Sequence, residues 1–516
     1  MPRYDYIAGP QSVPGGLMNA GLPSVEFAPA WPHSAGLRPR ALRRPASVAG
    51  ERLRDLLSLR PLRIDFLIVI AYIVVTRIFE LSAAKVGIQA GPVPIFLTDM
   101  VLFALLAVSL VKRPVKILFW VSSGSGAQAR GRAVWILAAV AVMYFIVAFQ
   151  DYRMFAFRDL AIFGYAVFFP LAYWTISSRA LAVRATRYFV YSGVILAILA
   201  LTQSLTGVNL GIAVGGRTVF GQIVGFLGSD DTAGVAAMSL AGLSAYLLLE
   251  RRRRAFHAAC ATLCFLALVQ SGSRSALFGF ALAGLVTFIL VAHRYRLAFL
   301  LFAGVLAGAI ALAPILPPDL PGVQPLLNFN LAVASATGGA ADPNGAFRIA
   351  RWKDTVGVWL NHPVFGIGFG ADIVNSALVR GWEREGQFNV GMPHNTYLFL
   401  LARMGLIGLG LIVFCWISGI LSIARAARRG RLPDDLAAVN VLVAMAGFAA
   451  FVLFFERPMN NASFWIMLAV AQRLADTSPA IAAREWYQRP HFGAPSIPVP
   501  APAGQTPAYG QNLSTS

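Results

Sequence analysis

The chain has 516 residues, of which 57% are hydrophobic and only 13% are charged, whereas soluble domains average roughly a quarter charged residues. This composition excludes an ordinary soluble domain and predicts a membrane protein. The formal net charge of +20 does not indicate nucleic-acid binding, because the arginines form short clusters between apolar runs instead of lining one polar face. No nucleic-acid partner is expected.

The two ends of the chain differ from the rest in composition. Residues 1–60 are rich in Pro, Gly and Arg and lack the apolar core of a signal peptide, so we expect a disordered, basic tail. Residues 476–516 are rich in Pro and Ala and predict a second disordered tail. Neither tail is expected to carry the chemistry.

Long apolar segments fill the sequence between the tails, and a helix needs about 20 such residues to cross a membrane. The pattern predicts an all-α polytopic membrane protein with about twelve transmembrane helices, distributed over 61–316 and 395–475. The expected spans are 62–80, 93–112, 133–150, 156–176, 188–206, 231–249, 255–271, 275–292, 297–316, 395–422, 436–455 and 461–475.

Clusters of basic residues follow every second span and therefore share one side of the membrane. They comprise Lys112, Arg113, Lys116, Arg130, Arg132, Arg179, Arg184, Arg187, Arg251 to Arg254, Arg294, Arg296, Arg425, Arg428, Arg429 and Arg431. Short cytoplasmic loops are enriched in Lys and Arg. The pattern therefore places this side, and with it both termini, in the cytoplasm.

The opposite, outer side carries residues 317–394, the one long hydrophilic connection, and such a connection is usually a functional loop or small domain. Within it, NGAFRIARWKDTVGVWL (344–360) has helical spacing of apolar residues. We expect a helix on the outer membrane surface or, alternatively, a helix packed within the loop. The following NHPVFGIGFG (361–370) predicts a tight glycine turn.

Arginine is frequent on this outer side, where the positive-inside rule disfavours it. Arg217 and Arg274 are the clearest examples, because they lie in short connections beside spans, whereas Arg348 and Arg351 belong to the long one. The planar guanidinium group suits phosphate oxygens, so the cluster predicts a phosphorylated lipid as ligand. The alternative for each arginine is contact with lipid headgroups or pairing with a neighbouring aspartate.

His394 stands directly before an apolar span. Histidine titrates near neutrality and can accept a proton from a hydroxyl nucleophile. Its alternative role is a helix cap or interfacial residue, but Asn395 or Thr396 can cap this helix, which favours His394 as a general base. The three cysteines lie in apolar runs and no Cys-x-x-Cys pair is present, so we expect core residues and no structural metal.

Three further observations limit the reactions that the chain can be expected to catalyse. The chain has no Walker phosphate-binding loop and therefore is not expected to hydrolyse ATP. The glycine-rich segments do not follow a buried strand, so no dinucleotide site is expected. The pair Asp230-Asp231 is not spaced like metal ligands for a nucleotide sugar and lies on the outer side. If the chain transfers sugars, the donor must therefore be linked to a lipid.

Four segments resemble the O-antigen ligase and polysaccharide polymerase superfamily of bacterial inner-membrane glycosyltransferases. The last two segments are the more specific, and the amino-terminal spans match only as generic apolar helices. Together the four fall within residues 200–425, in the family's order. They are GGRTVFG (215–221), SGSRSALFGF (271–280), FRIARWKDTVGVWLNHPVFGIGFG (347–370) and PHNTYLFLLARMGLIGLGLIV (393–413).

The resemblance implies a glycan donor on undecaprenyl pyrophosphate, delivered to the outer leaflet by a flippase. The glycan would pass to an acceptor hydroxyl of a glycan or of lipid A–core, with inversion and with no metal or nucleotide cofactor. By motif position, His394 is similar to the family's loop histidine, proposed to activate the acceptor. Arg217 and Arg348 are similar to the pyrophosphate-binding arginines, and Arg274 is expected to join them.

Supporting positions are expected at Arg351, Asn395 and Asp231. One departure concerns the segment after GGRTVFG, where members commonly show a Pro-Asn pair and this chain has GSDDTAGVAAM (228–238). Asp230 or Asp231 would take over that polar role, and the departure bears on the identity of the acceptor more than on the fold.

The preferred interpretation is a ligase-type glycosyltransferase with a periplasmic active site in the inner membrane. The alternative with the same donor chemistry is an exopolysaccharide or O-antigen repeat-unit polymerase. A transporter of lipid-linked sugar would instead predict internal repeats and charged or broken helices at the bilayer midplane. No repeat is found, and midspan charges are sparse. A structural membrane scaffold would not require His394.

Overall fold

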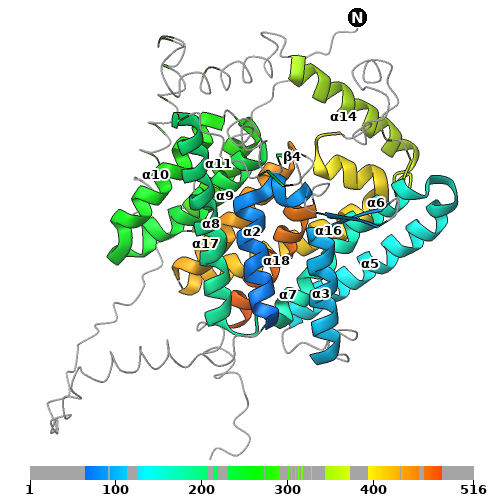
Figure 1. The fold of residues 1–516 in the computed structure, drawn as a ribbon, viewed down its shortest axis with the longest axis horizontal. Coiled ribbons are helices and arrows are strands. Elements are labelled where there is room, and N and C mark those ends of the chain that lie inside the picture. Colours follow the sequence, from blue (N-terminus) through cyan, green and yellow to red (C-terminus); the bar gives the residue numbers. More distant parts are fainter. Residues whose placement is uncertain are drawn as a thin grey trace, which may run out of the picture. The chain divides into compact units, whose positions relative to one another are not determined.

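The computed structural model describes the chain in separate stretches (Figure 1). They are 64–85, 87–90, 93–112, 125–206, 213–214, 217–218, 230–271, 273–290, 343–371, 393–430, 432–452 and 458–478, with single positions between 300 and 327 and at 373. Within them the protein is helical apart from two short antiparallel hairpins, which confirms the all-α prediction. Both predicted tails lie outside these stretches, except for residues 476–478.

Five helices in the described stretches are long and apolar enough to cross a membrane. They comprise Ala127–Tyr152, Arg179–Thr206, Thr232–Leu249, Arg251–Ser271 and Thr396–Gly430. The expected span 297–316 and most of the hydrophilic connection 317–394 lie outside the described residues. The count of about twelve spans and the domain boundaries therefore stay predictions.

The predicted span 93–112 begins later than expected. Its first residues form β2 (Val93–Phe96), which pairs antiparallel with β1 (Gly87–Ala90), and the helix α3 (Leu97–Lys112) starts only after them. Pro94 lies within β2, and proline is tolerated there because a two-stranded sheet consists of edge strands. The preceding helix α2 (Ile64–Lys85) extends the predicted span 62–80 by one turn.

The predicted span 156–176 is broken into three pieces. After α5 (Ser125–Tyr152) the chain forms α6 (Met154–Gly164), a 3₁₀ turn η1 (Tyr165–Val167) and α7 (Phe168–Thr175). Pro170 lies in the first turn of α7, where its missing N–H group is tolerated. An unbroken α-helix would require that N–H group, so the helix ends and restarts upstream of the proline.

The predicted span 188–206 starts nine residues too late. The helix α8 extends over Arg179–Thr206, and the hydroxyl of Ser178 accepts a hydrogen bond from the Leu181 N–H group at 3.4 Å. This is the position of a serine N-cap. The arginines at 179, 184 and 187, expected in a loop, therefore occupy the first turns of a helix.

The core is densest where α9 (Asp230–Leu249), α10 (Arg254–Ser271), α11 (Arg274–Leu290) and α17 (Pro433–Ala449) meet. At the contact of α11 with α17, a Cβ atom added to Gly279 would lie 2.5 Å from the carbonyl oxygen of Ala444. Glycine thus lets two backbones touch, as at many helix contacts within membranes. The three cysteines are buried and free, as predicted.

The remaining described helices are α14 (Pro343–Asn361), α16 (Thr396–Gly430) and α18 (Pro458–Asp476). The helix predicted for 344–360 is confirmed by α14. Helix α16 is kinked at Gly405, where φ is 61° and ψ is −158°. A Cβ atom at this position would lie 2.2 Å from the carbonyl oxygen of Val364. The kink therefore requires glycine.

We expect Gly405→Ala to lower the free energy of unfolding by about 2–4 kcal/mol, because it adds backbone strain and a steric clash. Thermal unfolding of the detergent-solubilised protein measures this change. Gly410→Ala is the matched control in the same helix, since an added Cβ atom there meets nothing within 4 Å. Equal unfolding temperatures for the two variants would contradict the role of the kink.

Candidate active site

His394 lies at the start of α16, in an uncommon backbone conformation. Its φ angle is +48°, and among the described residues only one other non-glycine residue, Arg153, has a positive φ. Such conformations cost about 1–3 kcal/mol and cluster at functional sites. The Asn395 side chain accepts hydrogen bonds from the N–H groups of Tyr397 and Leu398, at 3.0 and 3.1 Å. This confirms Asn395 as the helix cap.

Helix α14 approaches the peptide that precedes His394. The indole N–H of Trp352 donates a hydrogen bond to the carbonyl oxygen of Pro393, at 2.7 Å. Arg348 lies one helical turn before Trp352 and hence on the same face of α14. The half-buried Arg348 therefore belongs to the face that contacts the start of α16.

Arg351 lies deeper in the protein than Arg348 does. Its side chain is 3% exposed, and burial lowers the pKa of its guanidinium group below the usual value. The side chain of Thr355, one turn further on, is fully buried and donates a hydrogen bond to the Arg351 carbonyl oxygen at 2.7 Å. The supporting role of Arg351 stays a prediction.

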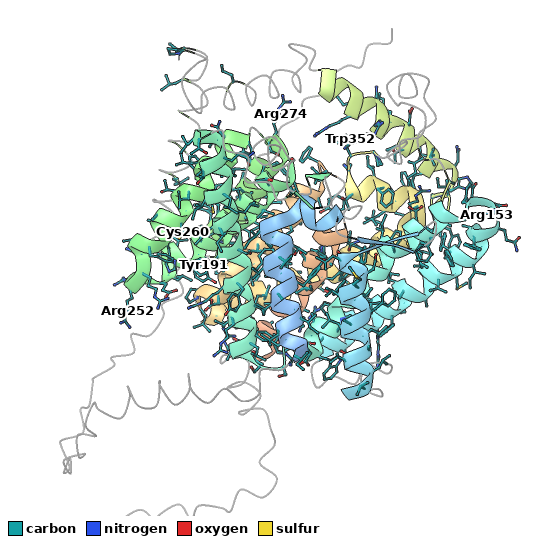
Figure 2. The ribbon with its side chains drawn as sticks, in the orientation of Figure 1. Arg153, Tyr191, Arg252, Cys260, Arg274 and Trp352 are labelled. Atoms are coloured by element: carbon teal, nitrogen blue, oxygen red, sulfur yellow. The ribbon has the colours of Figure 1, made fainter. Side chains whose placement is uncertain are left out.

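The start of α11 is connected to α14 through aromatic rings. Phe278 contacts Phe451 at 5.0 Å between ring centroids, and Phe451 contacts Trp352 at 6.3 Å. Arg274 is the first residue of α11, one turn before Phe278. Figure 2 accordingly shows Arg274 and Trp352 at the same end of the helices, with Arg252 at the other end. The structure thus brings together three of the four segments that carry the family resemblance, 271–280, 347–370 and 393–413.

Arg217 and Asp231 are described at the level of the backbone. Arg217 begins β4 (Arg217–Thr218), which pairs with β3 (Ala213–Val214), and Asp231 lies in the first turn of α9. Because α9 and α10 are consecutive and neighbouring, α9 begins at the end where α10 finishes and α11 starts. Asp231 thus belongs to a helix that begins at the end of the bundle that holds Arg274, whereas Arg217 lies in the β3–β4 hairpin.

Residues 361–370 form the predicted turn, which we call the glycine turn. Gly366, Gly368 and Gly370 all have positive φ angles, between 70° and 85°. The turn docks on the kink of α16 by backbone hydrogen bonds, including Ile367 N–H to the carbonyl oxygen of Ala402 at 2.8 Å. The turn therefore fixes the end of α14 against α16.

A buried ion pair that was not predicted from the sequence joins this turn to α6. Arg403 Nε lies 3.1 Å from Asp159 Oδ2, with side-chain exposures of 5% and 0%. The same carboxylate oxygen accepts a hydrogen bond from the Gly370 N–H group at 2.8 Å. A charged residue inside the apolar segment LLARMGLIG is the sequence signal that could have indicated it, because such residues are usually paired.

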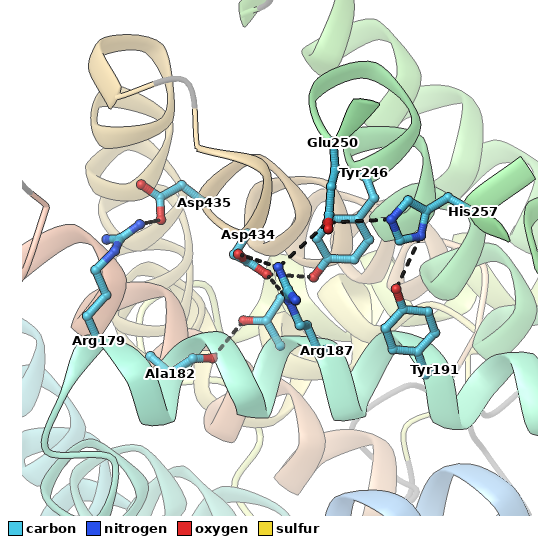
Figure 3. A network of polar contacts seen from close by, with 10 residues as sticks. Arg179, Ala182, Arg187, Tyr191, Tyr246, Glu250, His257, Asp434 and Asp435 are labelled. Atoms are coloured by element: carbon cyan, nitrogen blue, oxygen red, sulfur yellow. Dashed lines mark hydrogen bonds and ion pairs between the residues drawn. The ribbon is translucent and has the colours of Figure 1, made fainter. Parts of the chain in front are cut away.

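The opposite end of the bundle holds a separate polar network (Figure 3). There Arg187 pairs with Asp434 at 2.9 Å, Arg179 pairs with Asp435, and His257 lies 3.2 Å from the Tyr191 hydroxyl. These contacts tie the starts of α8, α10 and α17 together. The network contains none of the predicted site residues.

If the chain transfers glycans, as the resemblance implies, we expect Trp352→Phe to lower the rate about tenfold. The change keeps a ring but leaves the buried Pro393 carbonyl without its donor, a loss of about 1–3 kcal/mol. The assay compares transfer per folded protein in isolated membranes. Trp359→Phe is the control, since that indole N–H bonds the exposed Pro363 carbonyl at 3.1 Å. Equal losses in both variants would contradict a specific role for Trp352.

Among the described residues, no group of three or more His, Cys, Asp or Glu side chains is arranged to hold a metal ion. The site offers instead a histidine, a helix face with two arginines and the arginine at the start of α11. Such a set can accept a proton and neutralise an anionic leaving group. Independence from metal stays a prediction.

The fold and this polar end define a membrane protein with a candidate site at one end of its helices. Residues 258–413 match the family model of O-antigen ligase, which supports the resemblance to the O-antigen ligase and polysaccharide polymerase superfamily. The matched segment contains Arg274, Arg348, the glycine turn and His394, whereas Arg217 lies outside it. A comparison with curated proteins finds no match.

Proposed function

We propose that the protein transfers a glycan from undecaprenyl pyrophosphate to an acceptor hydroxyl at the periplasmic face of the bacterial inner membrane. The observation that carries this proposal is the hydrogen bond between Trp352 and Pro393, which joins the arginine-bearing face of α14 to the peptide of His394. The O-antigen ligase domain at 258–413 supports the same class of reaction.

The arrangement of the helix ends supports the proposed orientation. The starts of α8 and α10 and the end of α16 carry arginine clusters. Figure 2 shows Arg252, beside the start of α10, at the end opposite Trp352. The positive-inside rule then favours a cytoplasmic location for that end. The site would face the periplasm, with about twelve spans, both termini in the cytoplasm and one long periplasmic loop.

In the proposed reaction, His394 accepts the proton of the acceptor hydroxyl. The acceptor oxygen forms a bond to the anomeric carbon while the bond from that carbon to the pyrophosphate oxygen breaks. The leaving undecaprenyl pyrophosphate takes the electron pair, and attack from the opposite face inverts the anomeric centre. No cofactor is required.

The arginines act on the leaving group in this proposal. Arg348, Arg274 and Arg217 would hold the pyrophosphate, and their charge would stabilise the negative charge that develops as the bond breaks. Arg351, Asn395 and Asp231 are proposed as supporting residues. In the structure, Asn395 caps α16 directly after His394, a position in which it helps to fix the histidine backbone.

The transporter alternative requires charged groups in the bundle, and Arg77 in α2 is one. Its guanidinium stacks on the Phe189 ring at 3.9 Å and donates hydrogen bonds to Val235 and Ser239 of α9, both at 3.1 Å. Arg77 therefore joins α2, α8 and α9. A side chain that connects three helices favours a rigid bundle over the moving helices that a transporter requires.

Deletion of the gene in its own host tests the function and separates the two forms of the proposal. Loss of polymer from lipid A–core, with polymer accumulating on the lipid carrier, is the result expected for the ligase. Loss of all long polymer, with single repeat units on the carrier, would indicate the polymerase. An unchanged glycan profile would contradict both.

A further inference from the structure

We propose that the buried Asp159–Arg403 ion pair is a positioning element for transfer. It clamps the glycine turn, and through the turn it holds Arg348 of α14 in place relative to His394 of α16. This inference rests on the proposed function and adds two residues that touch neither substrate nor reacting atoms. The turn docks at Ala402, which lies six residues, or about 9 Å, along α16 from the start of that helix at Thr396.

Three hydrogen bonds of the pair reach the end of the glycine turn and the residue that follows it. Asp159 Oδ2 meets both the Arg403 guanidinium and the Gly370 N–H group, and Arg403 also donates to the carbonyl oxygens of Gly368 and Ala371. A buried ion pair adds little net stability compared with apolar side chains of similar volume. Its contribution is therefore better sought in fixing one geometry than in stability alone.

Two further contacts also hold the glycine turn in place. The hydroxyl of Tyr144 donates a hydrogen bond to the Phe365 carbonyl oxygen at 2.5 Å, and Phe369 stacks on Phe163 of α6 at 5.1 Å between ring centroids. Helices α5, α6 and α16 thus all hold the same short segment.

Helix α14 is attached to the region of α16 at two points. Helix α14 meets the segment just before α16 at Trp352, through the bond to Pro393. It ends at Asn361, nine residues or about 14 Å further on, where the glycine turn continues the chain onto α16. Two separate contacts restrain rotation of α14 relative to α16. Release of the turn would remove one of them and leave the contacts around Trp352, and Arg348 lies one turn before Trp352.

Transfer should be sensitive to such a pivot, since a misplacement of about 1 Å can cost about a hundredfold in rate. Asp159→Asn tests this, because the amide oxygen can still accept the Gly370 N–H bond while the charge is lost. Asp435→Asn is the matched control: it removes a buried carboxylate from the ion pair with Arg179 at the opposite end of the bundle.

Two measurements on the full chain are required. The first is kcat for transfer per folded protein. The second is the distance distribution between spin labels on Lys353→Cys in α14 and Gly410→Cys in α16, both exposed positions. The three native cysteines are buried, so labelling of the introduced thiols is selective. The label distances do not depend on activity.

For Asp159→Asn we expect kcat to fall at least about tenfold and the distance distribution to broaden, with neither change in Asp435→Asn. Tyr144→Phe, which removes one hydrogen bond from the turn, should shift both values in the same direction by less. It replaces Asp159→Asn if that variant fails to fold.

An unchanged distance distribution in the clamp variant would overturn the inference, whatever its kcat. A broadened distribution with full kcat would overturn it as well. Failure of the wild-type protein to transfer glycan would contradict the proposed function, while the label distances would still decide whether the pair clamps α14.

Discussion

Replacing His394 by alanine is expected to lower the rate of glycan transfer by about 10²–10⁴-fold, the range for loss of a general base. The change removes the imidazole that would accept the acceptor proton. It leaves the Asn395 cap and the Trp352–Pro393 bond intact. The protein should therefore accumulate in the membrane at the wild-type level. Transfer is measured in membranes of the deletion host that carry the variant.

His362 provides the matched control for this variant. It belongs to the same outer segment and is exposed at the start of the glycine turn. His362→Ala should therefore transfer glycan at close to the wild-type rate. Normal transfer by His394→Ala would remove the general-base role and leave the fold unaffected.

The second large effect is expected for Arg348→Ala, which should lower kcat for transfer by about 10²–10³-fold. A guanidinium aimed at the leaving pyrophosphate stabilises charge that is greatest in the transition state, so its loss affects kcat more than donor binding. Steady-state kinetics with varied donor concentration separate an effect on kcat from an effect on donor binding.

Lys353 serves as the control for Arg348, because it is a basic and exposed residue of the same helix. Lys353→Ala should have little effect on kcat. Arg348→Lys should retain part of the activity, since it keeps the charge but loses the planar pair of donors. A rate for Arg348→Ala equal to that of Lys353→Ala would contradict the proposed role.

The parts of the site that are encoded locally were predictable from the sequence. The helix α14 follows from apolar spacing, the glycine turn from its three closely spaced glycines, and the cap at Asn395 from its place before an apolar run. Each signal lies within a few residues of the structure it specifies, so no knowledge of the tertiary fold was necessary.

Contacts between distant segments were not predictable in the same way. The partner of Arg403 is Asp159, 244 positions earlier in the chain, and the Trp352–Pro393 bond joins two separate elements. The break before α7 had a local signal, Pro170, that hydropathy alone does not register, because a proline is tolerated in the first turn of a helix and not in its interior.

Glycan transfer by the purified protein in liposomes tests the central claim most directly. The vesicles would contain an undecaprenyl-pyrophosphate-linked glycan and an acceptor, with a chelator present and no nucleotide. We predict that the wild-type protein and His362→Ala transfer the glycan and release undecaprenyl pyrophosphate, whereas His394→Ala does not. Absence of transfer by the wild-type protein with both candidate acceptors, lipid A–core and a glycan repeat unit, would contradict the account.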